Sequence, residues 1–497
     1  MFPRRAVLCF VLALALCPAA PAGAEPLSQE AMAVHVLDRL SFGPYPGEIE
    51  RVRAMGWQVY VEEQLAPEKM ALPRALTDRL AALPTQSMDT VALFRAYGPK
   101  PPGGPRKTPT LDEINQAKEK AAVIQNEAAE ARLWRAILSP RQLEELLVGF
   151  WCNHFNVPAS KGLAHLWVGS FEREAVRPHV LGRFEDMLLA ATRHPAMLIH
   201  LENWLSASPE SPAGKALQRP LAELHARELL SSHTMGADAK PKAQDVQSLA
   251  LILAGWTVGS PRTPQDGGGF TFDERRHDMR DKPFLGQTVK GQGVAEGVEA
   301  LKLLAARPET ARSLAGKLAR FFVADAPPRE LEERLAKAWL DSGGDLRVVL
   351  GALFASPEFA DARFAGTKFK NPERWLVSVA RAASRPVVET RSLAEHLEWL
   401  DMPLYDAPGT SGFRDAQEAW LTAEGLLKRL NLAVQAGQGG LPCWSPGTWR
   451  ALEPLDAQTL AAVMGRTPSP DTAQALRDAA PDLKAGVFLG SPEAQRH

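Results

Sequence analysis

Apolar residues recur at steps of three and four along most of the chain, and this helical periodicity limits the fold more than any other feature of the sequence. The segments that show it include 46–65, 111–136, 217–234, 294–306, 308–322 and 345–355, and each is expected to form a helix. Pro308 and Pro357 mark segment boundaries. The strand–helix–strand alternation of a doubly wound sheet is missing. The pattern predicts a mainly α-helical fold, a large multi-helix domain with at most a small β-hairpin.

Two segments interrupt this helical pattern. The alternating run 269–272 (Gly-Phe-Thr-Phe) is typical of a short strand, and Thr288-Val289 is its candidate partner. Residues 98–110 are rich in Pro, Gly and Lys and predict a linker. We therefore expect an N-terminal helical segment at 25–97 and a main helical domain at 111–497.

The first 24 residues have the three parts of an export signal. Arg4 and Arg5 form a basic start, 8–16 is an apolar run too short for a permanent membrane anchor, and 22–24 (Ala-Gly-Ala) is a small-residue cleavage site. The mature chain is expected to start at Glu25, in the periplasm or outside the cell. An uncleaved N-terminal anchor is the alternative.

Charge and apolar length argue against two classes of partner. Without the two signal arginines the chain has 55 basic and 58 acidic residues, a balance that gives no overall attraction to nucleic acid. No later stretch is apolar for long enough to cross a membrane. Cys152 and Cys443 remain after signal removal, and the sequence leaves open whether they form a disulfide or stay as core thiols.

Short blocks spread over the chain resemble one known family. They are 37–44 (LDRLSFGP), 150–155 (FWCNHF), 226–236 (ARELLSSHTMG), 277–286 (HDMRDKPFLG), 356–359 (SPEF), 402–405 (MPLY) and 489–493 (LGSPE). Their order and spacing resemble the domain-of-unknown-function family 1800 (DUF1800). The resemblance implies an exported helical protein. It also implies a neighbouring exported alkaline-phosphatase-like protein as a candidate partner, but no reaction.

One block departs from the family pattern. Family members usually carry asparagines and a tyrosine just before the ARELL run, where this chain has 222–225 (Ala-Glu-Leu-His). If those groups bind a ligand in relatives, this chain binds it differently or not at all.

Three of these blocks carry groups suited to chemistry. His154 follows a long apolar run, as a metal ligand or general base would, although a core histidine bonded to a carbonyl is the plainer interpretation. Arg227 and Glu228 lie in an apolar helical pattern, so we expect each to meet a partner on another helix. In the functional interpretation, Glu228 acts as an acid or base and Arg227 binds an anionic group. The alternative is that both residues belong to a structural ion-pair network.

Further candidates flank these groups. His233 and Glu228 are favoured over His225, which stands where relatives tend to have tyrosine. His277 and Asp278 follow a glycine-rich segment, where a loop places ligands or, alternatively, solvated charges.

Convergence of these groups would create a mixed nitrogen and oxygen site. We predict His154, Glu228 and Arg227 as catalytic residues, and a divalent metal (Zn, Fe or Mn) held by His154, His233, His277 and Asp278. The signatures of serine hydrolases, phosphate loops, dinucleotide folds and haem attachment are missing. Two functions follow: an envelope enzyme or maturation factor with this polar site, or a non-catalytic helical assembly partner of another exported protein.

Overall fold

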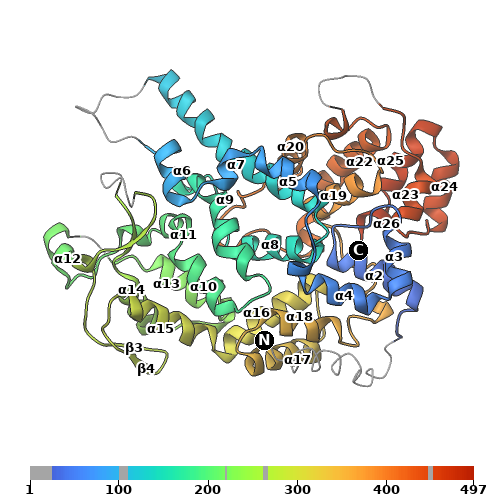
Figure 1. The fold of residues 1–497 in the computed structure, drawn as a ribbon. Helices are drawn as coiled ribbons and strands as arrows, with labels where there is room; N and C mark the ends of the chain where they lie inside the picture. Colours follow the sequence, from blue (N-terminus) through green and yellow to red (C-terminus); the bar gives the residue numbers. More distant parts are fainter. Residues whose placement is uncertain (1–24, 100–109, 219–220, 261–266, 446–451) are drawn as a thin grey trace.

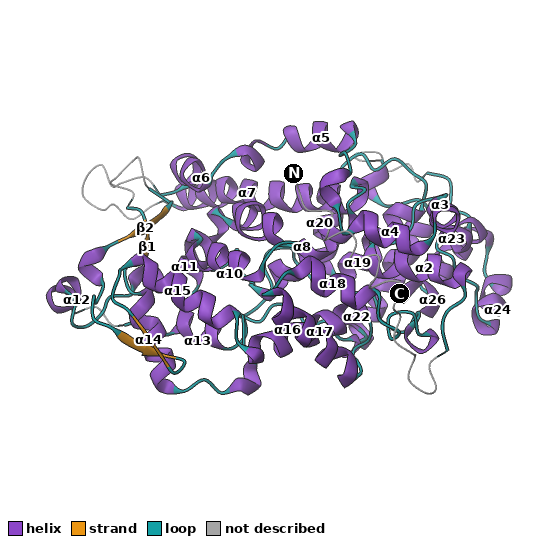
Figure 2. Ribbon diagram, turned by 60° about the horizontal axis from the view of Figure 1, so that its bottom comes forward, coloured by secondary structure: helices purple, strands orange, loops and turns teal. Residues whose placement is uncertain are grey.

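The computed structural model describes residues 25–99, 110–218, 221–260, 267–445 and 452–497. Helices dominate these residues, which confirms the mainly α-helical fold (Figures 1 and 2). The predicted export signal and most of the predicted linker lie outside the described residues. Among those described, no helix is both long enough and apolar enough to cross a membrane.

The helices that build the first half include α2 (Gln29–Leu40), α3 (Glu48–Met55), α4 (Trp57–Gln64), α5 (Arg74–Ala81), α6 (Thr90–Tyr97), α7 (Leu111–Leu138), α8 (Gln142–His154), α10 (Phe184–Arg193), α11 (Pro195–His200), α12 (Pro212–Leu217), α13 (Leu224–Leu230) and α14 (Ala243–Leu253). The second half includes α15 (Val294–Ala305), α16 (Pro308–Phe322), α17 (Arg329–Ser342), α18 (Leu346–Phe354), α19 (Pro372–Ala382), α20 (Arg391–Trp399), α21 (Gln417–Trp420), α22 (Ala423–Gly437), α23 (Ala457–Val463), α24 (Pro470–Asp478), α25 (Lys484–Leu489) and α26 (Pro492–Gln495).

Helix α7 is the longest of the described helices, with 28 residues. Thr110 caps it: its side chain accepts from the Glu113 backbone N–H, and the Glu113 carboxylate accepts from the Thr110 backbone N–H. This reciprocal capping box satisfies two backbone donors that a helix start leaves free. It explains why the helix begins at the residue that the sequence predicts.

The N-terminal helices lie beside the C-terminal ones rather than apart from the main body. Helices α2, α3 and α4 lie next to α23, α24 and α26 in Figure 1. Arg466 donates to the Asp38 carboxylate at 2.7 Å, and one hydrophobic core extends from Met32 to Ala494. Packing of the two ends of the chain therefore closes one side of the molecule.

Local glycine geometry and loops shorten several predicted helices. The predicted helix at 46–65 is two helices, α3 and α4, because Gly56 lies between them with φ +90°. The predicted helix at 217–234 is wrong for most of its length, since only α13 is helical there. In both regions the apolar periodicity continues across a bend in the chain. Packing determines the position of the bend, and helix propensity does not.

The small β structure comprises two hairpins, and the predicted pairing is wrong. Strand β2 (Phe270–Phe272) pairs antiparallel with β1 (Trp256–Val258), and β3 (Lys282–Phe284) pairs with β4 (Gln287–Val289). Leu285 and Gly286 join β3 to β4 with φ of +50° and +80°. Two consecutive residues with positive φ are typical of a two-residue hairpin turn, which explains why 288–289 pairs locally.

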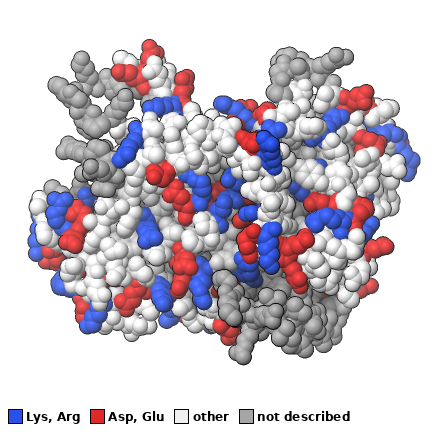
Figure 3. Space-filling view, viewed as in Figure 1, with Lys and Arg blue, Asp and Glu red and all other residues white. Residues whose placement is uncertain are grey.

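Basic and acidic side chains are interspersed on the face shown in Figure 3, without an extended region of one sign. This distribution agrees with the nearly balanced charge of the sequence. This face therefore shows no charged surface that indicates a binding site.

Candidate functional site

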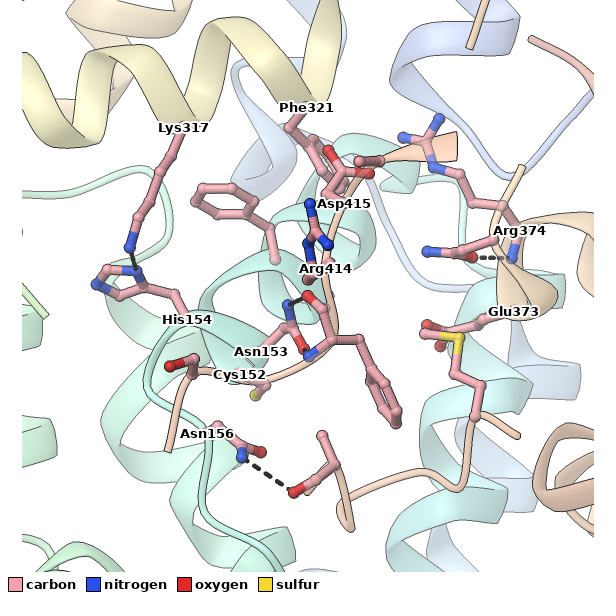
Figure 4. Close-up of a pocket in the computed structure, with 18 of the residues that line it drawn as sticks. Cys152, Asn153, His154, Asn156, Lys317, Phe321, Glu373, Arg374, Arg414 and Asp415 are labelled. Carbon is pink, nitrogen blue, oxygen red and sulfur yellow. Dashed lines mark hydrogen bonds between the residues drawn. The ribbon is translucent and has the colours of Figure 1, made fainter. Parts of the chain in front are cut away.

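A cavity of about 680 Å³ lies between α8, α16, α19 and the segment 402–420. Figure 4 shows His154 and Lys317 on one side of it and Glu373 and Arg374 on the other. Phe321 and Arg414 lie between these two groups. The volume is in the range of small-molecule binding sites.

Helix α8 brings the first group of side chains to the cavity. Its apolar face packs Trp151 into the core, and Phe155 follows directly after the helix, both fully buried. The His154 ring lies edge-on to both aromatic rings, with centroid separations of 5.2 and 4.7 Å. This packing fixes the orientation of His154 at the cavity wall.

The contacts of His154 define its protonation state. Nε2 lies 3.1 Å from the carbonyl oxygen of His233, so Nε2 carries a proton and donates it. Nδ1 lies 3.2 Å from the Nζ of Lys317, and an amine that donates there requires an unprotonated Nδ1. His154 is therefore the neutral Nε2–H tautomer. Burial, followed by the charges of Lys317 and His233, lowers the pKa of His154 well below its ordinary value.

Lys317 is the most unusual charged group of the cavity. Its Nζ donates to His154 Nδ1 and, at 2.9 Å, to the carbonyl oxygen of Ser232. Among the described residues, no carboxylate lies within ion-pair distance of this amine, and the side chain is half-buried at the cavity wall. Burial, with a smaller effect from Arg320, lowers the pKa of Lys317 to about 8.

Two asparagines of the same block hold the opposite wall in place. Asn153 donates to the carbonyl oxygen of Phe413 at 2.8 Å and accepts from the Phe413 N–H at 2.7 Å. Asn156 donates to the carbonyl oxygens of Ala407 and Gly409 at 3.1 and 2.8 Å. These bonds fix the segment 402–416, which has no regular secondary structure, against the end of α8.

Four acidic side chains line the cavity; three of them are in ion pairs, and the fourth, Glu418, is exposed. Asp325 and Asp415 both pair with Lys368, at 2.7 and 3.3 Å, and Glu373 pairs with Arg132 at 2.8 Å. The cationic side chains that line the cavity are Arg132, Lys317, Arg320, Arg374 and Arg414. Among the described residues, only Arg132 of these has a carboxylate within ion-pair distance.

The remaining cationic side chains contact groups other than carboxylates or are exposed to solvent. Arg374 donates to His497 Nδ1 at 2.8 Å and lies over the Phe321 ring, 4.9 Å from its centroid. Burial lowers the pKa of Arg374 to about 10. Arg320 and Arg414 are exposed at the cavity edge. An anionic group in the cavity would therefore meet cations that are not in an ion pair with a carboxylate.

Aromatic and aliphatic side chains cover much of the remaining wall. The aromatic ones are Phe42, Phe150, Phe171, Phe321, Tyr405, Phe413 and Trp420. A ligand that fits such a wall combines an apolar part with a charged group.

The structure separates the predicted catalytic residues. His154 lines the cavity, and His233 lies behind it, with ring centroids 6.0 Å apart. Glu228 is not a lining residue; it accepts from the Ser232 hydroxyl at 2.5 Å. Arg227 is exposed and pairs with Glu223 at 2.7 Å on its own helix, so the expectation of a partner on another helix is wrong. Helical periodicity alone does not show which side of a short helix faces solvent.

The predicted His277 and Asp278 pair lies in a different environment. His277 contacts the carbonyl oxygen of Ala254 at 2.7 Å and the Glu296 carboxylate at 2.8 Å. Arg280 binds both carboxylate oxygens of Asp278. Neither residue lines the cavity. Their contacts tie the loop between the two hairpins to α14 and α15.

These contacts occupy several of the atoms that the predicted metal set would use. Both ring nitrogens of His154 and of His277 are engaged, and so are both oxygens of Asp278. Within the described ranges, no group of three or more His, Cys, Asp or Glu side chains is arranged to hold a metal ion. The predicted convergence on Zn, Fe or Mn is therefore not observed there.

Sequence reasoning missed Lys317, Arg374 and the roles of the asparagines. Lys317 lies in an amphipathic helix, where a lysine normally marks the solvated face. The sequence indicates a functional role of Lys317 only through its spacing from Arg320, since the two residues are one helical turn apart. The two cysteines are both free thiols, and burial raises the pKa of the cavity-lining Cys152.

The fold and the cavity define a mainly helical protein whose site is assembled from segments far apart in sequence. The family model described as "Protein of unknown function (DUF1800)" matches residues 35–496. The chain belongs to this family, which confirms the resemblance. No curated protein and no solved structure gives a significant match.

Four of the blocks that carry the resemblance meet at the cavity: 37–44 through Phe42, 150–155, the end of 226–236, and 402–405. The departure at 222–225 lies elsewhere. His225 is fully buried there, and neither of its ring nitrogens has a hydrogen-bond partner. None of the positions 222–225 lines the cavity, and only His225 among them is buried in the core beside α13.

Proposed function

We propose that this is an exported protein that binds a small molecule with a negative charge and an apolar part, and acts on it by acid–base chemistry of Lys317 and His154. The observation that supports this proposal is the pairing of charges in the cavity: the acidic groups Asp325, Glu373 and Asp415 are in ion pairs and Glu418 is exposed to solvent, whereas the half-buried Lys317 has no ion pair. A buried charge without a counterion is costly, so an anionic ligand gains free energy by supplying one.

Acid–base chemistry needs a group that changes charge near neutral pH and a neighbour that shares the proton. Lys317 and the neutral His154 are joined by a hydrogen bond and face the cavity. Of the two functions expected from sequence, this arrangement supports the enzyme, because it places ionisable groups with shifted pKa values in one cavity. It replaces Glu228 and Arg227 by Lys317 as the partner of His154.

Binding should be tested with a panel of aromatic and aliphatic carboxylates and phosphates, using calorimetry on the mature protein. Arg320→Gln should weaken binding of the best ligand about tenfold, since a charge-assisted hydrogen bond contributes about 1.5–3 kcal/mol. Arg312→Gln is the matched control, because Arg312 is exposed on the same helix but does not line the cavity. Equal effects of the two variants, or preference for neutral analogues, would reject the proposal.

Export is tested separately, by N-terminal sequencing of the protein from the periplasmic fraction. A start at Glu25 supports export with cleavage after Ala24. A start at Met1 in a protein recovered outside the cytoplasm supports the uncleaved anchor instead, and recovery only from the cytoplasm contradicts export.

A second candidate function is assembly with another exported protein, such as the alkaline-phosphatase-like partner that the family suggests. The observation that favours it is a set of exposed apolar side chains on α20 and α22, namely Trp399, Leu427 and Leu430. If this surface binds a partner, Leu427→Gln should reduce co-purification of that partner without affecting ligand binding in the cavity. Unchanged co-purification would remove this candidate.

A further inference from the structure

The contacts of Lys317 suit a reactive amine better than a simple anion contact. A neutral amine has two N–H bonds and one lone pair. His154 Nδ1 and the Ser232 carbonyl oxygen supply two acceptors, at 3.2 and 2.9 Å. Both N–H bonds are thereby used, and the remaining tetrahedral position is left for the lone pair. Since Lys317 lines the cavity, the lone pair is accessible to a ligand there.

The other cations of the cavity differ from Lys317 in this respect. Arg320, Arg374 and Arg414 keep their charge at all physiological pH values, because guanidinium groups do not deprotonate under these conditions. They are suited to hold an anionic substituent, whereas Lys317 is suited to react. Lys368 provides an internal contrast: it is as buried as a core residue, but it forms ion pairs with the carboxylates of Asp325 and Asp415.

We propose that Lys317 forms an imine with an aldehyde or ketone that carries a carboxylate or phosphate. This inference rests on the proposed function and names its substrate class: anionic carbonyl compounds. The aromatic wall, which includes Phe321 and Phe413, suits a planar apolar part between the carbonyl and the anion.

The step balances without a further reactant. The Lys317 Nζ lone pair attacks the carbonyl carbon, and the C–O double bond becomes a single bond. His154 Nδ1 accepts a proton from Nζ and passes it to the carbonyl-derived oxygen. Loss of the resulting hydroxyl, with the second Nζ proton, releases one water and leaves a C=N bond. His154 begins and ends neutral, as its contacts require.

Imine formation can be trapped by cyanoborohydride, which reduces the C=N bond to a stable secondary amine. We would treat the full mature chain with 4-carboxybenzaldehyde or with its neutral analogue, methyl 4-formylbenzoate, and quantify modified lysines by peptide mass spectrometry. Lys302, which is exposed, reports the background reaction, and Lys368 reports a buried but ion-paired amine. Lys317→Arg keeps a cation at this position but removes the reactive amine.

The expected result is that Lys317 is modified at least tenfold faster than Lys302 by the carboxylated aldehyde, and that the neutral ester loses this preference. Lys368 should remain unmodified. Arg414→Gln should reduce the rate at Lys317 and leave the rate at Lys302 unchanged. Modification of Lys317 no faster than Lys302, or equal rates with the two aldehydes, overturns the inference.

A binding measurement with 4-(hydroxymethyl)benzoate distinguishes failure of the imine inference from failure of the proposed function. This compound has the carboxylate but no aldehyde or ketone carbonyl for Lys317 to attack. If it binds the cavity and Lys317 stays unmodified, the imine is rejected and anion binding stands. If it does not bind and no modification occurs, both proposals fail.

Discussion

The side-chain amide of Asn153 forms two hydrogen bonds with the backbone of Phe413, donating to its carbonyl oxygen at 2.8 Å and accepting from its N–H at 2.7 Å. The two residues are 260 positions apart in sequence. The amide thus donates to and accepts from the backbone of one residue, as a neighbouring β-strand would, although the segment that contains Phe413 is not a strand. The shape of the cavity therefore depends on one residue of α8.

Asn153→Ala should lower the free energy of unfolding by about 1–3 kcal/mol, because it leaves both backbone groups of Phe413 without these partners. Ligand binding in the cavity should weaken at the same time, since the 402–416 wall is released. Urea denaturation measures the first effect and calorimetry the second. Asn431→Ala, at an exposed position on α22, is the control and should change stability by less than about 0.5 kcal/mol.

Gly412 and Gly409 form a matched pair for testing how closely this segment approaches α8. Both have positive φ, +68° and +75°. A Cβ at Gly412 would lie 2.2 Å from the carbonyl oxygen of Asn153, whereas a Cβ at Gly409 has nothing within 4 Å. Both alanine variants therefore include the backbone strain, of about 1–2 kcal/mol, but only Gly412→Ala adds the steric clash. We expect Gly412→Ala to be clearly less stable in thermal denaturation; equal losses would contradict the close approach.

Lys317 makes the stability depend on pH in alkaline solution. Its pKa is lowered from 10.5 to about 8 in the folded state, so below pH 8 the folded protein holds a charge that burial disfavours. Stability should rise as pH increases from about 8 towards 10, because the unfolded chain then binds the extra proton. The upper limit of the gain is about 3 kcal/mol. Lys317→Met should be more stable than the wild type at pH 7, and the difference should vanish near pH 10.

Urea denaturation of both proteins at several pH values provides the measurement. Lys302→Met, at an exposed lysine, should show no such convergence. If the wild-type protein instead loses stability between pH 8 and 10 relative to Lys317→Met, the predicted direction of the pH dependence is wrong.

Buried histidines should make the chain sensitive to acid. Burial, as the largest cause, lowers the pKa of His35, His194 and His225 to about 3 and that of His200 to about 4. Below pH 6.5 the unfolded chain binds protons that the folded chain excludes, so stability falls with pH. At pH 5 the loss for these four groups is roughly 8 kcal/mol, comparable to the whole stability of a typical domain.

We therefore expect acid unfolding with a midpoint between about pH 4 and 6. This is above the pH range in which carboxylates ordinarily take up protons. Circular dichroism across this range measures it. His225→Phe, which removes a buried group without hydrogen-bond partners, should shift the midpoint to lower pH. His165→Gln should leave it unchanged, because His165 is only half-buried.

The fold class could be predicted because helical periodicity is a local property of the sequence. Helix α16 begins and ends where Pro308 and the apolar pattern predict. The hairpin pairing could not be predicted in the same way, since the turn at Leu285 and Gly286 does not have one of the common two-residue signals. Local patterns define elements, and long-range packing selects their partners.

The candidate site was only partly predictable for the same reason. His154 was identified because its block contrasts with the apolar residues before it. Lys317 was missed because its neighbours in sequence are those of a surface lysine, and only the approach of α16 to α8 buries it. Arg227 illustrates the opposite error, since an apolar helical pattern surrounds a side chain that is exposed.

The wall of the cavity contains residues from Phe42 to Trp420. During synthesis from the N-terminus, His154 therefore leaves the ribosome long before Phe413, the residue that completes its surroundings. A chain interrupted between these two positions would contain helices α7 and α8 but no enclosed site. The proposed binding and chemistry in this cavity consequently require the finished polypeptide, and we expect neither in fragments or early folding intermediates.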